Sequence, residues 1–201
     1  MAPSYTLSFR NAPDWDSLPI MEAQHCGWTP ESGIRAFARA FYDGEALHIR
    51  MEAVEPELRA TFTGLLDHVC EDSCLEFFFA PRTDDPRYFN FEWNPLGALD
   101  LSFGYGRPNR VRQVAKDCQT LFHPAPFRTE TGWGIDFSIP LAFLRIYFPD
   151  YAFSGQAAGN FYKCGDKTVQ PHFLAWSPLR SQTPDFHRRE DFGLLSYETA
   201  L

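Results

Sequence analysis

The chain has 201 residues, which at about 150 residues per domain predicts one domain over residues 1–201. Its formal charge of −8 disfavours nucleic acid or an anionic membrane as a partner, because both would repel the average surface. With 44% hydrophobic residues and no apolar run of about 18 residues, the sequence excludes wholesale disorder and a helical membrane span. Residues 1–10 show no basic region followed by an apolar stretch, so no signal peptide is visible and the cytoplasm is the default location.

Aromatic residues and prolines are the distinctive part of the composition. Phe, Tyr and Trp make up 16% of the chain, and 16 prolines mark many turns. Aromatic side chains fit the half-buried surface of a pleated strand, so this composition indicates a β-rich protein. The five cysteines are an odd number with no Cys-x-x-Cys pair, which favours free buried thiols over a disulfide scaffold or a zinc motif.

The first clear strands form a hairpin. Residues 34–42 and 47–51 alternate apolar and polar side chains on either side of Asp43-Gly44, a dipeptide that favours a tight turn. The alanines of residues 36–40 would also suit a helix. The Asp-Gly pair is what favours two strands here.

The clearest alternation in the chain follows. In residues 72–79 and 88–94 every second side chain is apolar, which predicts two strands that each bury one face. A short helix is predicted after Pro140, and further strands at 99–105, 135–139, 160–164, 172–176 and 192–197. Short strands at this spacing predict an all-β fold, an antiparallel β-sandwich. We expect its core to contain Leu75, Phe77, Phe89, Phe91, Trp93, Ile135, Phe137 and Phe161.

The polar face of the 88–94 strand carries an unusual set of side chains. Tyr88, Asn90, Glu92 and Asn94 share this face, and Glu76 joins them if the 72–79 strand is the neighbour. A solvated outer face is one interpretation, although such faces are usually rich in Lys and Thr. Asn amides and carboxylates can each hold two adjacent hydroxyls, so the face predicts a site for a neutral mono- or oligosaccharide.

An aromatic ring is the second part of a sugar site, because the apolar C–H face of a sugar packs on it. Trp28 and Trp176 each precede a proline-containing turn, which suits the rim of a pocket. A structural tryptophan at the end of a strand would fit both positions as well.

Several segments, in matching order, resemble the family 9 carbohydrate-binding modules. They are residues 43–49 (DGEALHI), 72–78 (DSCLEFF), 88–92 (YFNFE) with Asn94 and Gly97, 132–140 (GWGIDFSIP), 160–164 (NFYKC), 175–178 (AWSP) and 192–193 (FG). The resemblance spans roughly residues 34–197. It implies an immunoglobulin-like β-sandwich that binds sugars without cleaving them, with Glu76 as the binding glutamate and Trp176 as the stacking ring.

Two features depart from the family pattern. Cys74 stands in the DSCLEFF strand, and residues 160–166 with 171–173 form a distinctive segment. We also expect no enzyme domain beside this chain. We therefore expect a divergent, stand-alone branch whose candidate ligand-binding residues are Glu76, Tyr88, Asn90, Glu92, Asn94, Asn160, Lys163, Trp176 and Trp28.

An enzyme is the alternative function. Glu76 and Glu92 could act as acid and base in glycoside hydrolysis, or could serve a metal-dependent enzyme. The accessory groups for such chemistry would be Lys163, Asp166, His172 and His187. No His-x-His, His-Glu-x-x-His or Gly-x-Ser-x-Gly motif supports this alternative, so we expect a non-catalytic protein.

No cofactor is predicted, although a structural calcium ion could bind the loop carboxylates Asp43, Asp84 and Asp85. The sequence has no calcium-loop motif at these positions. Cys74 and Cys164 could approach each other if their strands are neighbours. The simpler interpretation is that both cysteines act as small hydrophobic side chains in the sheet, and the alternative is a redox role.

Overall fold

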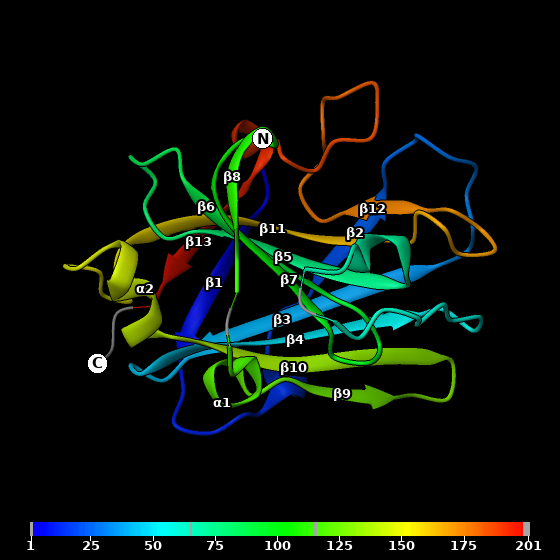
Figure 1. Cartoon of the computed structure of the whole chain (residues 1–201). Coiled ribbons are helices and arrows are strands. Elements are labelled where there is room, and N and C mark those ends of the chain that lie inside the picture. The colour runs from blue at the N-terminus through cyan, green and yellow to red at the C-terminus, as the bar shows by residue number, and fades with distance from the viewer. Residues whose placement is uncertain (1, 65, 115, 199–201) are drawn as a thin grey trace.

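Two β-sheets pack face to face in the computed structural model, which describes residues 2–64, 66–114 and 116–198 (Figure 1). Alternating apolar side chains account for these layers, because each strand buries one face against the opposite sheet. Sheet A has the order β8 (Asn109–Gln113), β7 (Leu99–Tyr105), β6 (Tyr88–Trp93), β5 (Cys74–Ala80), β11 (Gln156–Cys164), β12 (Phe173–Ala175). Sheet B has the order β2 (Met21–His25), β3 (Arg35–Tyr42), β4 (Ala46–Val54), β10 (Gly132–Pro140), β9 (Ala125–Arg128).

The first strands of the chain join the two sheets. β1 (Ser4–Phe9) pairs in parallel with β13 (Gly193–Tyr197) and also with β3 of sheet B. β13 pairs antiparallel with β11, and β2 pairs antiparallel with β12 of sheet A as well as with β3. The predicted all-β sandwich is confirmed. The two parallel ladders of β1 differ from the purely antiparallel arrangement that we expected.

Helical segments are short. α2 (Leu141–Tyr147) begins directly after Pro140, as the sequence predicts, and α1 (Cys118–Phe122) precedes β9. Single 3₁₀ turns lie at η1 (Trp15–Ser17), η2 (Val69–Glu71) and η3 (Arg189–Asp191). Within the described ranges, no helix is long and apolar enough to cross a membrane.

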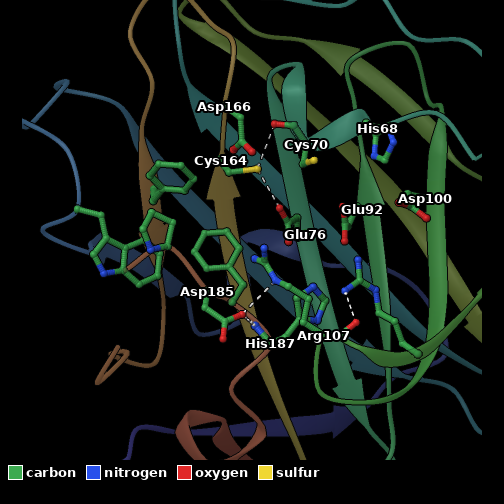
Figure 2. A pocket seen from close by; sticks show the side chains of 15 residues that line it. His68, Cys70, Glu76, Glu92, Asp100, Arg107, Cys164, Asp166, Asp185 and His187 are labelled. Carbon is green, nitrogen blue, oxygen red and sulfur yellow. Dashed lines mark hydrogen bonds and ion pairs between the residues drawn. The ribbon is translucent and has the colours of Figure 1, made fainter. Parts of the chain in front are cut away.

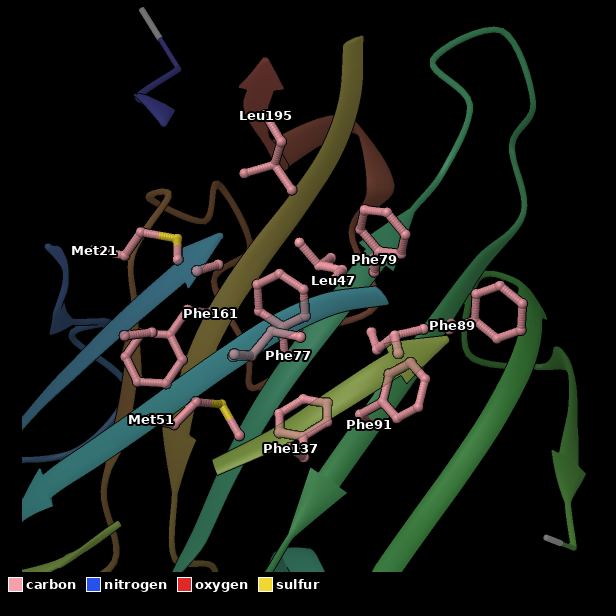
Figure 3. Packing of buried hydrophobic residues seen from close by; sticks show 14 of the residues in the cluster. Met21, Leu47, Met51, Phe77, Phe79, Phe89, Phe91, Phe137, Phe161 and Leu195 are labelled. Atoms are coloured by element: carbon pink, nitrogen blue, oxygen red, sulfur yellow. The ribbon is translucent and has the colours of Figure 1, made fainter. Parts of the chain in front are cut away.

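Phenylalanine rings fill the space between the sheets (Figure 3). Phe161, Phe77 and Phe91 are register partners across β11, β5 and β6, and all three are fully buried. Phe137 of β10 meets Phe91 from sheet B, with the ring centroids 5.7 Å apart. All eight predicted core residues lie in this buried cluster, so the predicted core is confirmed.

The other face of sheet A collects polar side chains. Successive residues of a strand point to opposite faces, so the neighbours of the buried phenylalanines point away from the core. Tyr162, Glu76, Glu92 and Asp100 are register partners across β11, β5, β6 and β7. All four are buried, although they lie outside the sandwich interior. Loops that fold over this row therefore enclose it from the outside.

Candidate functional site

A cavity of about 280 Å³ lies over the polar row of sheet A (Figure 2). Glu76, Glu92, Asp100 and Cys164 come from the sheet and form its floor. Residues around this floor form the walls of the cavity. They are Trp28, His68, Cys70, Arg107, Arg110, Asp166, Phe173, Pro184, Asp185, Phe186 and His187.

Glu76 and Glu92 face each other across β5 and β6, and no Lys, Arg or His in the described ranges forms an ion pair with either. Glu76 Oε1 accepts a hydrogen bond from the Cys164 thiol at 2.9 Å, and Glu92 Oε1 accepts one from Asn90 Nδ2 at 2.8 Å. Burial raises the pKa of Glu76 to about 7. Burial, and then repulsion from Glu76, raises the pKa of Glu92 well above its usual range. At neutral pH the pair therefore retains protons and can donate as well as accept hydrogen bonds.

Asp100, the third carboxylate of the row, is compensated by an arginine. Arg112 Nε lies 3.0 Å from Asp100 Oδ1, and Arg112 Nη2 lies 2.8 Å from Oδ2. Such a two-point pair fixes the carboxylate in position and gives it a direct cationic partner. Glu76 and Glu92 are thus the floor carboxylates without a direct cationic partner among the described residues.

Aromatic rings form one wall of the cavity. The Trp28 ring lies 5.7 Å from that of Phe173 and 5.8 Å from that of Phe186, measured between centroids. Trp28 Nε1 donates to the carbonyl oxygen of Ser181 at 3.0 Å, which fixes the indole in place. Phe186 in turn stacks on Tyr162 of the sheet at 4.2 Å. This wall is a rigid apolar surface of the kind on which a sugar ring packs.

Polar side chains flank the aromatic wall and form the rest of the rim. The Tyr88 hydroxyl lies 2.9 Å from Nδ1 of His187, and Arg107 Nε lies 3.4 Å from Asp185 Oδ1. Burial, together with Arg110 and Arg107, lowers the pKa of His187 far below its usual value. His187 is therefore a neutral ring at physiological pH, and the charged groups of this rim are the arginines and Asp185.

Of the predicted ligand-binding residues, Glu76, Glu92 and Trp28 line the cavity. Tyr88 and Asn90 lie on the same face of β6 and contact cavity residues from behind. Tyr88 contacts His187, and Asn90 contacts Glu92. These five predicted residues are brought together, three as lining groups and two as their supports.

Asn94, Asn160 and Trp176 do not line the cavity, which differs from their predicted place in the binding site. Asn94 Oδ1 accepts the backbone N–H of Ala98 at 3.0 Å and organises the turn before β7. Asn160 exchanges two hydrogen bonds with the backbone of Ser177, at 3.0 and 2.8 Å. Trp176 packs in the sandwich core. The polar atoms of both amides are already used within the chain, so they are not free to meet a ligand.

Lys163 points into the sandwich interior, which corrects its expected place in the site. Its ammonium lies 3.2 Å from Glu55 Oε2 and 2.7 Å from His172 Nε2, and donates to the Cys164 carbonyl oxygen at 2.7 Å. Burial, and then Lys163, lowers the pKa of His172 to about 4, so the neutral ring accepts a hydrogen bond from the ammonium. We call Glu55, Lys163 and His172 the inner cluster.

A serine–histidine–aspartate chain on sheet B bears on the enzyme alternative. His48 Nδ1 lies 2.9 Å from Ser138 Oγ, and His48 Nε2 lies 2.8 Å from Asp43 Oδ2. Asp43 Oδ1 also accepts the backbone N–H of Ala46, within the turn between β3 and β4. Ser138 lies inside the regular strand β10 rather than on a sharp turn that exposes a nucleophile. We assign the three side chains to anchoring this hairpin.

The other carboxylates considered for calcium also have partners. Asp84 pairs with Arg82 at 3.1 Å, and Asp85 pairs with Arg87 at 2.6 Å. A calcium ion would have to compete with these arginines. Calcium binding stays a prediction.

Sequence reasoning misses much of the cavity wall, because most of the wall comes from loops. Arg107 and Arg110, of which Arg110 belongs to β8, carry no sign in the sequence of what they face. Phe186 lies in a loop without strand periodicity, beside His187. The available signal was this aromatic residue in an otherwise polar, proline-containing segment.

A model of the family described as "Carbohydrate-binding family 9" matches residues 11–197. The chain belongs to carbohydrate-binding family 9. Membership confirms the resemblance predicted from the sequence, and it agrees with the prediction of a non-catalytic, carbohydrate-binding protein.

Solved structures of family 9 and related proteins share the fold. A putative carbohydrate-binding protein from Bacteroides uniformis superposes with a TM-score of 0.83 at 28% identity, covering 98% of this chain and 100% of that one. A family 9 module from Caldicellulosiruptor kristjanssonii in complex with cellotriose has a TM-score of 0.69 at 10% identity, covering 98% and 95%. The same organism's family 9 module in complex with glucose has a TM-score of 0.66 at 10% identity, covering 98% and 97%. The comparison with curated proteins gave no match.

Proposed function

We propose that the cavity over sheet A binds a neutral mono- or oligosaccharide and leaves it chemically unchanged. The observation that carries this proposal is that one cavity joins the buried pair Glu76 and Glu92 to the aromatic wall of Trp28. The carboxyl pair supplies donors and acceptors for hydroxyl groups, and the indole supplies a surface for the C–H face of a ring. Family 9 membership supports a sugar as the ligand.

The charges of the cavity favour a neutral sugar over an acidic one. Its lining contains five carboxyl groups against two arginines, Arg107 and Arg110. Arg107 is already paired with Asp185. A uronate or sulfated sugar would lie among this excess of carboxyl groups, and the ionised ones oppose an anionic ligand in a partly buried site.

The size of the cavity limits how much of a sugar chain it can enclose. Small-molecule pockets usually measure about 300–1,000 Å³, and this cavity measures about 280 Å³. Because its volume lies just below that range, we infer that it encloses one ring and at most part of a second, as a free sugar or as the end of a chain. Glucose and cello-oligosaccharides are the first candidates, because solved family 9 modules hold glucose and cellotriose.

Weak binding is expected from a site of this kind. A few hydrogen bonds and one stacked ring correspond to a dissociation constant on the order of micromolar to millimolar. Added salt should change the affinity little, because hydroxyl groups carry no charge.

Calorimetric titration with a panel of neutral sugars tests the proposal, beside an assay for hydrolysis products on the same panel. Glu92→Ala should weaken binding by roughly 1–3 kcal/mol, about 5- to 150-fold, because it leaves ligand hydroxyls unpaired. Glu22→Ala, on the exposed face of β2, is the matched control and should bind like the wild type. Hydrolysis products that vanish in Glu92→Gln would instead establish an enzyme. An equal loss of binding in Glu92→Ala and Glu22→Ala would show that the cavity is not the sugar-binding site.

A further inference from the structure

Two thiols and a carboxylate converge at one end of the cavity floor. Cys74 and Cys164 are direct register partners on β5 and β11, and Glu76 lies two residues after Cys74 on the same face. One oxygen of Glu76 and the two sulfur atoms all lie within 4.8 Å of one another, and all three side chains are buried. Figure 2 shows the Cys164 thiol directed at the Glu76 carboxylate.

We propose that Cys74 Sγ, Cys164 Sγ and Glu76 Oε1 bind a thiophilic divalent cation of the zinc class, with its remaining coordination position directed toward the cavity. Zinc accepts sulfur and carboxylate ligands in one tetrahedral site, with about 2.3 Å to sulfur and 2.0–2.2 Å to oxygen. Ligand atoms this close together can reach a common ion with small adjustments of their side chains. Calcium and magnesium do not fit this set, because they require six or more oxygen ligands.

The charge distribution around the cluster favours a cation at this place. Glu76 receives a thiol hydrogen bond and no direct ion pair from the described chain, and Glu92 opposes it across the strands. A cation between the sulfur atoms and Glu76 would neutralise this carboxylate and reduce its repulsion with Glu92. Ligand burial also removes competing water from three sides of the ion.

An entry path and an open coordination position exist. Cys164 and Glu76 line the cavity, and Cys74 lies beside them on the same outer face of the sheet, within the buried apolar cluster of that face. An ion can therefore arrive through the cavity and retain one water molecule or ligand atom on that side, as sites with three protein ligands do. The two thiols come from strands far apart in the sequence, which explains why no spaced cysteine motif is visible.

Binding must displace protons from the thiols, because the thiolate is the form that ligates a metal. Affinity should therefore rise with pH, by at least tenfold between pH 6 and pH 8. This dependence separates a thiolate site from a site made of surface carboxylates, whose affinity changes little over the same range.

Titration of reduced, metal-free protein with Co²⁺, followed by competition with Zn²⁺, is the first test. We expect one thiolate-to-cobalt charge-transfer band per chain, abolished by one equivalent of Zn²⁺. Cys74→Ser and Cys164→Ser should each lower the affinity at least tenfold, as should Glu76→Gln. Cys118→Ser, which removes a half-buried thiol of α1 outside the cavity, is the matched control and should keep the band.

X-ray absorption of the zinc-loaded wild-type protein keeps the proposal testable if a variant does not fold. The expected first shell holds two sulfur atoms at about 2.3 Å and lighter ligands at about 2.0 Å. A shell without sulfur, no charge-transfer band at equal protein and cobalt concentrations, or a band lost equally in Cys118→Ser overturns the proposal.

The metal site and the sugar site can fail independently. Cys74→Ser, which removes a thiol that does not line the cavity, should lose the metal and keep the heat of sugar binding. Glu92→Ala should keep the cobalt band and lose sugar affinity. Sugar titrations in a chelator therefore test the cavity alone, and cobalt titrations without sugar test the ligand cluster alone.

Discussion

Two groups of buried ionisable side chains lie on opposite faces of sheet A, and they differ in how their charges are compensated. In the inner cluster, the ammonium of Lys163 has an acceptor for each of its three protons, in Glu55, His172 and a backbone carbonyl. On the outer face, Glu76 and Glu92 face each other without an ion-pair partner among the described residues. The two groups are separated by the thickness of one strand, since Lys163 and Cys164 are consecutive residues of β11.

Glu55 is the acceptor around which the inner cluster is built. Its Oε2 accepts from Trp133 Nε1 at 3.0 Å as well as from Lys163, and its Oε1 accepts from Ser73 Oγ at 2.9 Å. A buried carboxylate whose two oxygens both accept hydrogen bonds contributes to a rigid, closed structure. Buried carboxyl groups that lack an ion-pair partner can instead bind a ligand that supplies the missing hydrogen bonds or charge. The comparison therefore separates a structural role for the inner cluster from a binding role for the cavity.

Lys163→Met should have the largest effect on stability. The substitution keeps most of the side-chain volume and leaves Glu55 charged, buried and without a cation, which typically costs about 3–5 kcal/mol. Urea unfolding at pH 7 measures the loss. The double variant Glu55→Gln, Lys163→Met should recover part of it, because it removes the uncompensated charge. A loss below 1 kcal/mol for Lys163→Met would mean that the inner cluster is not what holds this end of the sandwich together.

Glu76→Gln should behave in the opposite way, and its effect should depend on pH. The pKa of Glu76 is about 7 in the folded protein against an ordinary 4.5, so the folded state holds the extra proton between these values. The wild type should therefore lose stability as pH rises from about 4.5 through 7, by up to about 3 kcal/mol. Glu92, whose pKa is also raised, adds a change of the same sign.

Urea unfolding in a chelating buffer at pH 5 and pH 8 measures this dependence. Glu76→Gln should reduce the difference between the two pH values, and the variant should match or exceed the wild type in stability at pH 8. A variant that is less stable than the wild type at pH 8 would show that the charged Glu76 carboxylate is stabilised in the folded protein. Glu76 would then not differ from the inner cluster in this respect.

Ser73→Ala should have the smallest of these effects. It removes one hydrogen bond to the buried carboxylate of Glu55, which retains its contacts with Lys163 and Trp133. A hydrogen bond to a charged group contributes about 1.5–3 kcal/mol, and the lower end is expected here because two partners remain. Guanidinium unfolding of Ser73→Ala beside Ser154→Ala, an exposed loop control, gives the difference. Equal midpoints would show that the Ser73 hydroxyl adds nothing to the cluster.

Sequence alternation was sufficient to place Glu76 and Glu92 on one face and Phe77 and Phe91 on the other. Period-two patterning is a local property, and neighbouring strands in the chain paired as neighbours in the sheet. Cys74 and Cys164 are neighbours because β5 and β11 pair directly. The sequence left this pairing open, because the two strands lie far apart along the chain.

For Lys163, residue type and strand alternation point in opposite directions. It lies between Tyr162 and Cys164, which both face outward, so alternation alone would have turned it inward. A lysine is rarely buried without a partner, and its partner Glu55 lies far away in the sequence. Trp176 follows the last residue of β12, where alternation no longer predicts a direction.

The elements that the sequence did not indicate are short or lack a local partner. β8 and β9 alternate weakly, with mostly polar or exposed side chains. β1 has only six residues, and its partner β13 lies at the other end of the described chain. The cavity walls depend on the same kind of distant contact, which is why the floor was predictable and the walls were not.

The ladder between β1 and β13 also bears on the order in which the protein folds. Ser4 pairs with Leu194, so this ladder can form only when almost the whole chain is available. Contacts between residues this far apart form slowly, because the entropy of closing a long loop must be overcome first. On the ribosome, the hairpin of β3 and β4 and the meander from β5 to β8 emerge much earlier and can pair with their neighbours during synthesis. We therefore expect β1 to stay unpaired with β13 until translation has passed β13, and the joining of the two sheets through β13 to be a late event in folding.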